Sequence, residues 1–291
     1  MLPVEHATRT VETPDGRTIG VHEAGDPDGF PVVYHHGTPG SGLLYASWAT
    51  PGVRLIGYDR AGYGASTRRA GRSVADVAAD IDAIADALGL DRFGTWGLSG
   101  GGPHALATGA LCSRAVACAS VAGVAPWGAE GLDWLAGMGE DNVKEFDLVL
   151  AGEDALRPAI ERDRGELLAA SAEDVLASVE TLLGEADRRA LTGELAEFVH
   201  GSMGRGLARS GDGWLDDDLA FVEPWGFDLT AIPCPVLVVQ GGDDRFVPKA
   251  HGDWLASHIP NAEAWLDEEN GHLTMIQTRV AEVQAWLQSH S

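Results

Sequence analysis

Short apolar runs alternate along the chain with longer segments that repeat their apolar residues at helical spacing. The runs Pro31–His35, Val53–Tyr58 and Ala115–Ala122 are typical of buried strands. Between them, Ser73–Leu88 places apolar residues at helical intervals and stops at Gly89. Since strands that alternate with helices form parallel sheets with both faces covered, this pattern predicts an α/β fold: a mostly parallel, eight-stranded sheet with helices on both faces.

The two ends of the chain supply the outer strands of this sheet. Near the N-terminus, Thr8–Thr13 and Thr18–Glu23 alternate around a Pro-Asp-Gly turn, which predicts two strands of a meander. Near the C-terminus, the β-branched run Pro235–Gln240 and the short segment Ala262–Leu266 predict the last two strands.

The alternation is interrupted at residues 125–225, which are rich in helix-forming and acidic residues. This segment holds 23 Asp and Glu against 8 Lys and Arg. It is too long for a loop, so we predict a helical cap (a lid) inserted into a core domain of residues 1–124 and 226–291. We expect its charges to lie on solvated faces. The large apolar residues Trp127, Trp134 and Met138, together with Phe246, are candidates for the substrate pocket.

Composition and charge exclude several classes of function. The formal charge of −24 argues against a nucleic-acid or membrane-surface partner. No apolar stretch approaches the roughly 20 residues that span a bilayer. The 3 cysteines are too few and too scattered for a disulfide framework or a metal cluster. Because the first residues lack the pattern of a secretory signal, we expect a cytoplasmic protein.

The segment Gly97-Leu98-Ser99-Gly100-Gly101 has the pattern G-x-S-x-G between a predicted strand and a predicted helix. On such a turn the Ser99 hydroxyl stands clear of the sheet, at the positive end of the helix. The turn strains the backbone, and a side chain at Gly97 or Gly101 would clash. Ser99 is therefore the candidate nucleophile. We expect the glycines that follow it to make the adjoining wall open and flexible.

A serine hydroxyl needs a base to take its proton, a carboxylate to orient that base, and donors for the oxyanion that forms. His272, on a glycine-flanked loop after the last strand, is the candidate base. Asp244, on the turn after the strand at residues 236–239, is the candidate acid. Asp243 is the alternative, since only one of two adjacent side chains can point at the histidine. An open parallel sheet gathers its functional residues at these strand ends.

Backbone N–H groups of Thr38 and Gly100 are the candidates for the oxyanion hole. Thr38 lies in the loop after the strand that ends at His35, and Gly100 directly follows Ser99. We expect His36 and the segment at residues 59–66 to support this loop in a structural role.

With its candidates in the order Ser, Asp, His, the chain resembles the α/β-hydrolase fold family, in particular lidded members such as esterases, lactonases, perhydrolases and proline iminopeptidases. The motifs that carry the resemblance are His36-Gly37-Thr38-Pro39-Gly40, Asp59-Arg60-Ala61-Gly62-Tyr63-Gly64-Ala65-Ser66, Gly97-Leu98-Ser99-Gly100-Gly101, Asp244 through Pro248, and Gly271-His272. The resemblance implies a serine nucleophile, a helical lid and no metal or organic cofactor. Serine at position 99, on the strand-to-helix turn, excludes the haloalkane dehalogenase and epoxide hydrolase branches of the family, which use aspartate as the nucleophile at this position. The proline iminopeptidase signature around the serine is not matched.

We therefore predict a serine hydrolase that cleaves a carboxylic ester or lactone through an acyl-enzyme intermediate. An aromatic-lined cap favours an uncharged or apolar small-molecule substrate, and the acidity of the cap disfavours an anionic one. Two alternatives stay open. One is a ligand-binding, receptor-like protein with slow turnover. The other is an amide or C–C bond hydrolase that uses the same triad.

Overall fold

The computed structural model describes residues 7–171, 173–174, 180–190 and 193–291. Residues 1–6, from which we predicted in part that the protein is cytoplasmic, lie outside the described residues. The described strands are β1 (Ala7–Glu12), β2 (Thr18–Gly25), β3 (Phe30–His35), β4 (Val53–Tyr58), β5 (Phe93–Leu98), β6 (Ala115–Val121), β7 (Val236–Gly241) and β8 (Ala262–Asp267). They form a single sheet in the order β1-β2-β4-β3-β5-β6-β7-β8.

The sheet is mostly parallel, as predicted. β2 runs antiparallel to both of its neighbours, β1 and β4, and the remaining neighbouring pairs are parallel. Because β3, β5, β7 and β8 run in one direction, their C-terminal ends lie at the same edge. The loops that carry Thr38, Ser99, Asp244 and His272 all leave the sheet at that edge.

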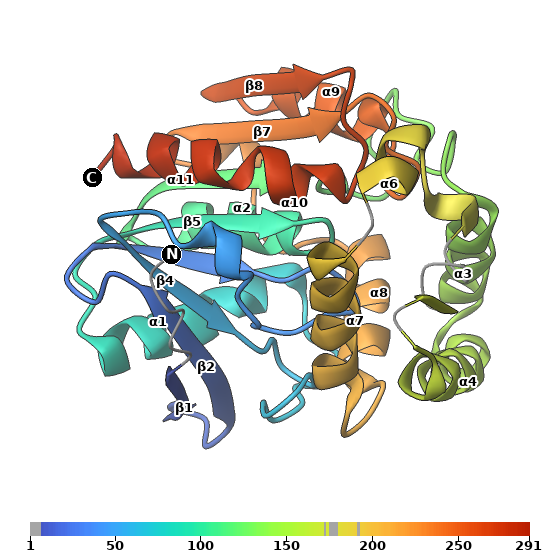
Figure 1. The fold of residues 1–291 in the computed structure, drawn as a ribbon, viewed down its shortest axis with the longest axis horizontal. Coiled ribbons are helices and arrows are strands. Elements are labelled where there is room, and N and C mark those ends of the chain that lie inside the picture. The colour runs from blue at the N-terminus through green and yellow to red at the C-terminus, as the bar shows by residue number, and fades with distance from the viewer. Residues whose placement is uncertain (1–6, 172, 175–179, 191–192) are drawn as a thin grey trace.

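Helices cover both faces of the sheet, which confirms the predicted layers (Figure 1). One face packs against α1 (Val77–Leu88), α2 (Gly101–Leu111) and α9 (Lys249–His258), and the other against α10 (Thr274–Thr278) and α11 (Val280–Gln288). The alternation of side chains along each strand divides the core accordingly: Val33 of β3 faces the first layer, and Val32 and Tyr34 face the second. None of the described helices is long and apolar enough to cross a bilayer.

Between β6 and β7 the described residues form helices and no strand. These are α3 (Glu140–Ala151), α4 (Glu153–Ala169), η3 (Glu180–Leu182), α6 (Glu185–Ala190), α7 (Glu194–Leu207), α8 (Asp212–Val222) and η4 (Leu229–Ala231). Shorter 3-10 turns, η1 (Ala46–Trp48) and η2 (Val74–Asp76), lie earlier in the chain. Figure 1 shows α3, α4, α6, α7 and α8 beyond the arrowheads of β5 and β7. This helical segment therefore lies over the edge at which the candidate residues meet.

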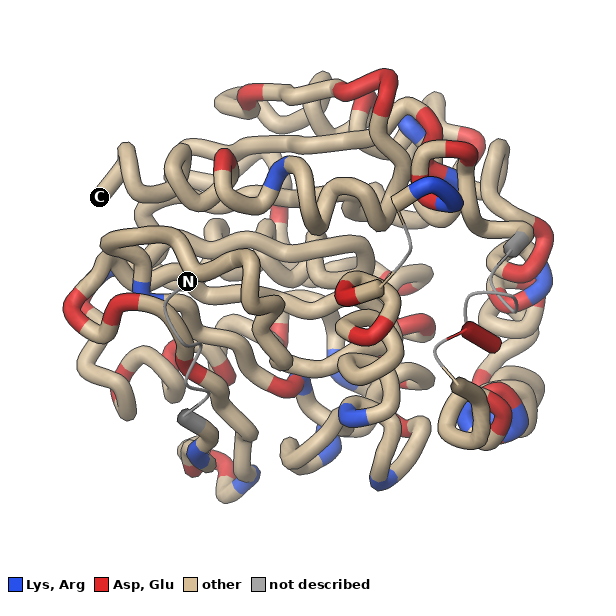
Figure 2. The backbone as a smooth tube through the Cα atoms, in the orientation of Figure 1, with Lys and Arg blue, Asp and Glu red and all other residues tan. Residues whose placement is uncertain are grey.

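The expectation that the acidic residues of this segment are solvated is wrong for four of them. Many Asp and Glu positions of this segment do lie along its helices, as the red parts of the backbone in Figure 2 show. However, Asp187 on α6 and Asp216, Asp217 and Asp218 on α8 are at most 3% exposed. A buried carboxylate is stable only when donors or cations surround it. The partners of these aspartates lie largely in the core domain, at the candidate site.

Candidate active site

Ser99 lies on the predicted strand-to-helix turn, between the end of β5 and the start of α2. Its φ of +55° is a left-handed conformation that residues other than glycine rarely adopt. The flanking glycines permit this turn. A Cβ atom on Gly97 would lie 2.0 Å from the Gly101 carbonyl oxygen, and one on Gly101 would lie 2.1 Å from the His35 carbonyl oxygen. The predicted clashes are thus present, and the backbone is held in a strained conformation that exposes Ser99 in part.

His272 and Asp244 form a buried hydrogen-bonded pair. His272 Nδ1 donates to Asp244 Oδ2 at 2.8 Å, and both residues are at most 4% exposed. The other carboxylate oxygen, Oδ1, accepts hydrogen bonds from the backbone N–H groups of Phe246 and Val247 at 2.9 and 2.8 Å. Gln240 Nε2 also donates to Oδ2 at 3.0 Å. Asp244 is therefore fixed, and its orientation leaves His272 Nε2 as the unprotonated nitrogen.

Electrostatics favours protonation of this histidine. Burial disfavours the imidazolium, but the charge and the hydrogen bond of Asp244 outweigh it, so the pKa of His272 is raised above its usual value. The Phe246 ring stacks on the imidazole, with centroids 4.6 Å apart and planes inclined by 21°. An imidazole held in this way can accept a proton and release it in a later step.

Among the described residues, the hydrogen bonds of His272 run to Asp244 and Asp187, and none of them reaches Ser99. The structure thus brings the candidate base and the candidate acid into contact. Ser99 lies on the same sheet edge but makes no direct hydrogen bond with His272. Catalytic hydrogen bonds are often long in the absence of substrate and tighten when it binds.

Asp243, the alternative acid, has a different partner. Its Oδ2 accepts a hydrogen bond from the backbone N–H of Ala186 at 2.9 Å. A Cβ atom on Gly184 would lie 2.5 Å from the same carboxylate. Asp243 therefore holds the first turn of α6 against the core domain, whereas Asp244 points at the histidine.

The two oxyanion candidates flank Ser99. A Cβ atom on Gly37 would lie 3.5 Å from Ser99 Cβ, and one on Gly100 would lie 2.3 Å from Thr38 Oγ1 and 3.0 Å from the Phe221 ring. Within the described residues, the backbone N–H groups of Thr38 and Gly100 donate no hydrogen bond to another backbone group. The expectation of an open wall is wrong: close packing, rather than flexibility, explains why glycine follows the serine.

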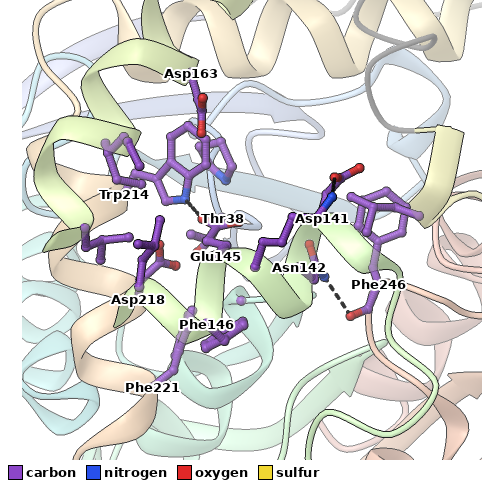
Figure 3. Close-up of a pocket in the computed structure, with 18 of the residues that line it drawn as sticks. Thr38, Asp141, Asn142, Glu145, Phe146, Asp163, Trp214, Asp218, Phe221 and Phe246 are labelled. Atoms are coloured by element: carbon purple, nitrogen blue, oxygen red, sulfur yellow. Dashed lines mark hydrogen bonds and ion pairs between the residues drawn. The ribbon is translucent and has the colours of Figure 1, made fainter. Parts of the chain in front are cut away.

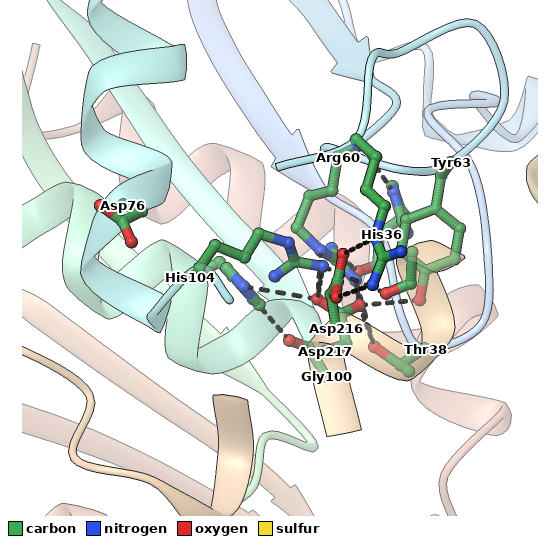
Figure 4. Close-up of polar contacts among 12 residues, drawn as sticks. His36, Thr38, Arg60, Tyr63, Asp76, Gly100, His104, Asp216 and Asp217 are labelled. Atoms are coloured by element: carbon green, nitrogen blue, oxygen red, sulfur yellow. Dashed lines mark hydrogen bonds and ion pairs between the residues drawn. The ribbon is translucent and has the colours of Figure 1, made fainter. Parts of the chain in front are cut away.

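The Thr38 side chain is held by a buried ionic cluster that centres on Asp217 of α8 (Figure 4). Thr38 Oγ1 and Tyr63 Oη donate to Asp217 Oδ2 at 2.7 and 2.8 Å. Arg60 Nη2 and Arg72 Nη2 donate to the same carboxylate, each at 2.6 Å. Burial alone would raise the pKa of Asp217, but the two guanidinium groups reverse this and hold it well below its usual range. The two guanidinium groups therefore favour the charged form of Asp217, next to Thr38.

The histidines of this loop are structural, as expected for His36. Its Nδ1 donates to the Gly37 carbonyl at 2.7 Å, and its Nε2 accepts from the Arg60 backbone N–H at 3.1 Å. The Arg60 side chain also donates to the His36 carbonyl. His35 is buried and hydrogen-bonded to Tyr58 and Thr95 at 2.7 and 2.9 Å, so it joins neighbouring strands.

Asp187 of α6 holds the loop of the candidate base. Its carboxylate accepts hydrogen bonds from the backbone N–H groups of His272, Leu273 and Thr274, at 2.8 to 2.9 Å. Burial raises the pKa of Asp187, and these donors oppose that rise. Sequence reasoning missed both Asp187 and Asp217. The run of three aspartates at residues 216–218 was the available signal for Asp217, since three successive positions spread over about 200° of the helix surface and one of them then lies close to the packed face. Asp187 had no such signal.

A cavity of about 420 Å³ opens at Ser99, and Thr38 and Gly100 also line it. Of the pocket candidates, Met138 and Phe246 line this cavity. Trp127 and Trp134 are not among its lining residues, so the prediction for these two is wrong. Trp134 is instead core: its Nε1 donates to the Ala125 carbonyl at 2.7 Å, and its ring contacts Trp127 at a centroid distance of 5.3 Å. Among the described residues, no group of His, Cys, Asp and Glu side chains is arranged to hold a metal ion.

Comparison with known proteins gives partial matches to sequences and full-length matches to structures. A family model described as alpha/beta hydrolase fold matches residues 31–278. A non-heme chloroperoxidase of Streptomyces lividans is 39% identical over 88 residues, which are 28% of this chain and 31% of that protein. A proline iminopeptidase of Xylella fastidiosa is 34% identical over 113 residues, 37% of this chain and 36% of that one. These alignments span about a third of the relatives' length.

An esterase of Rhodococcus sp. ECU1013 has a similar structure over nearly the whole chain. The TM-score is 0.70 at 21% sequence identity, and the superposition covers 98% of this chain and 99% of the esterase. At this identity, the likeness establishes a shared fold.

Proposed function

Since the chain belongs to the alpha/beta hydrolase fold family, we propose that it is a serine hydrolase that cleaves a carboxylic ester or lactone through an acyl-enzyme intermediate. The observation that carries the proposal is the φ of +55° at Ser99, on the turn between β5 and α2 and on the wall of a cavity. Strain of this kind is concentrated at active sites. Ala122 has a similar φ of +51° but does not line the cavity, so the strain and the cavity together support the proposal.

In the proposed reaction, Ser99 Oγ attacks the substrate carbonyl while His272 Nε2 accepts the hydroxyl proton. The N–H groups of Thr38 and Gly100 hold the oxyanion that develops. His272 then donates the proton to the leaving alcohol, and water hydrolyses the acyl-enzyme by the same sequence. Asp244 stabilises the imidazolium in both steps. The 2.8 Å hydrogen bond between His272 and Asp244 supports these roles.

Amide cleavage is a second candidate, favoured by the partial match to the Xylella fastidiosa proline iminopeptidase. The same attack and proton transfers serve an amide, with an amine as the leaving group. The proline iminopeptidase signature around Ser99 is not matched, which favours the ester, and analysis of the products distinguishes ester from amide cleavage.

Hydrolysis of short-chain 4-nitrophenyl esters by the wild-type protein and by Ser99→Ala tests the proposal. Loss of the nucleophile is expected to lower kcat by about 10⁴-fold or more. Ser257→Ala, at an exposed serine, is the matched control and is expected to retain wild-type rates. Equal rates for wild type and Ser99→Ala would overturn the proposal.

A panel of esters, lactones and amino-acid anilides, together with a fluorophosphonate probe, separates the alternatives. Rapid labelling of Ser99 with turnover of esters or lactones supports the leading proposal. Preferential turnover of anilides supports amide cleavage. Thermal stabilisation by a ligand without labelling or turnover indicates a receptor-like protein.

A further inference from the structure

The cavity at Ser99 is strongly acidic on the side formed by α3, α4 and α8 (Figure 3). Its charged lining residues are Asp141, Glu145, Asp163, Glu166 and Asp218 against Lys144 and Arg162. The two cations are already paired, since Lys144 Nζ lies 3.2 Å from Asp141 and Arg162 Nε lies 2.8 Å from Asp163. Excess negative charge therefore faces the space that a substrate would occupy.

Two of these carboxyl groups, Glu145 on α3 and Asp218 on α8, face each other within hydrogen-bonding range. Asp218 is 3% exposed, and no N–H or O–H donor among the described residues reaches its Oδ2. Glu145 accepts one hydrogen bond, from Trp214 Nε1 at 2.6 Å. Burial and the neighbouring carboxylate raise the pKa of Asp218, and burial raises that of Glu145. Among the described residues and apart from each other, the pair has one hydrogen-bond donor, Trp214, and Arg72 only partly offsets its charge, so Asp218 Oδ2 is left without a donor.

The nearest cations of the cluster around Thr38 are already engaged. Arg72 and Arg60 donate to Asp217, the neighbour of Asp218 in α8, as described above. A buried carboxylate oxygen without a donor is costly, and its position on the wall of a cavity points to a donor that arrives from outside.

We propose that Glu145 and Asp218 form a subsite for a protonated primary or secondary amine of the substrate, whose carbonyl lies at Ser99. This inference rests on the proposed function and specifies the substrate class. An ammonium group supplies an N–H donor for Asp218 Oδ2 and a positive charge against both carboxyl groups. The apolar part of the substrate would pack against Phe146, Phe221 and Trp214, which line the same cavity. The expected uncharged, apolar substrate is thereby refined to an apolar substrate with one cationic group.

Pairs of 4-nitrophenyl esters that differ only in an ammonium group test this subsite. Each ω-aminoacyl ester, with three to six chain atoms, is compared with the alkanoyl ester in which a methyl group replaces the ammonium. At its best chain length, wild type is expected to prefer the amino ester by about tenfold or more in kcat/KM, as for a charged hydrogen bond. The isosteric variants Glu145→Gln and Asp218→Asn are expected to lower this ratio toward one.

Asp147→Asn is the matched control, because Asp147 is exposed on the same helix, two residues after Glu145. It is expected to keep the wild-type preference. A wild-type ratio of one or below at every chain length, or a ratio that survives in both Glu145→Gln and Asp218→Asn, would overturn the subsite. Variants that fail to fold are recognised by their low melting temperature. In that case the ratio of the two kcat/KM values in wild type alone tests the subsite.

Binding of hexylammonium to Ser99→Ala separates this inference from the proposed function. The subsite predicts a rise in Tm with hexylammonium and none with hexanol, and loss of the rise when Asp218→Asn is added. If wild type hydrolyses neither ester while hexylammonium still binds, the proposed function fails and the subsite stands. If the alkanoyl ester is hydrolysed and hexylammonium does not bind, the subsite fails and the hydrolase stands.

Discussion

Thr38 Oγ1 donates a 2.7 Å hydrogen bond to Asp217 Oδ2, across 179 positions of the chain. This bond joins the loop after β3 to helix α8. We expect it to set the position of the Thr38 backbone N–H. Thr38→Val keeps the shape and removes the hydroxyl, so it is expected to lower kcat about tenfold with little change in KM. Steady-state kinetics on a neutral ester measures both constants.

Thr38→Ser keeps the hydroxyl and is the matched control for Thr38→Val. It is expected to retain most of the wild-type kcat. Equal kcat values for Thr38→Val and wild type would show that the bond does not position the loop.

Asp217 itself is expected to be essential for the fold as well as for the site. Asp217→Asn leaves the buried guanidinium groups of Arg60 and Arg72 without their counter-charge. Breaking a buried ionic pair in this way costs about 3–5 kcal/mol of unfolding free energy. Urea denaturation of the variant measures the loss. A change below about 1 kcal/mol, the typical value for an exposed ion pair, would contradict the burial of this cluster.

Asp187 is expected to act through the backbone of the His272 loop. Asp187→Ala removes the acceptor of three N–H groups and is expected to lower kcat at least about tenfold and unfolding free energy by about 3 kcal/mol. Ester kinetics and urea denaturation measure the two effects. Asp147→Asn, at an exposed position, serves as the control, and unchanged kcat in Asp187→Ala would mean that the loop keeps its position unaided.

Substitution of the two adjacent aspartates, Asp243 and Asp244, is expected to lower kcat to very different extents. Asp244→Asn removes the carboxylate that orients His272 and is expected to lower kcat by about 10⁴-fold. Asp243→Asn perturbs one hydrogen bond, to the backbone N–H of Ala186 at the start of α6. It is expected to lower kcat less than about tenfold. A reversal of this order would assign the triad acid to Asp243.

Activity is expected to fall in acid through protonation of His272. In the proposed reaction His272 must be neutral to accept the Ser99 proton, and Asp244 raises the pKa of His272. Activity is therefore present above that raised pKa and is lost as pH falls through it. The acid limb of kcat/KM for a neutral ester should have its midpoint above the ordinary value of about 6.5. A midpoint well below this value would contradict the Asp244–His272 pairing in solution.

Local sequence was sufficient for the strand and helix pattern and for the candidate nucleophile. Apolar periodicity predicted the helix at Ser73–Leu88 and its end at Gly89, and the structure forms η2 and α1 over Val74–Leu88 with Gly89 as the C-cap. The pattern G-x-S-x-G predicted the strained turn at Ser99, because the constraint acts between near neighbours such as Gly97 and Gly101. Periodicity and turn geometry are properties of a few consecutive residues, so a single sequence contains them.

The tertiary structure decided which buried residues serve the cavity and which serve the core. Trp134 and Met138 are both large, apolar and in one segment, yet only Met138 lines the cavity. It also decided the roles of Asp187 and Asp217, whose partners lie 85 and 179 positions away. Such contacts depend on how helices that are distant in sequence pack over the sheet edge. These hydrogen bonds and ion pairs are strong because water is excluded around them, and water is excluded only once the chain has folded.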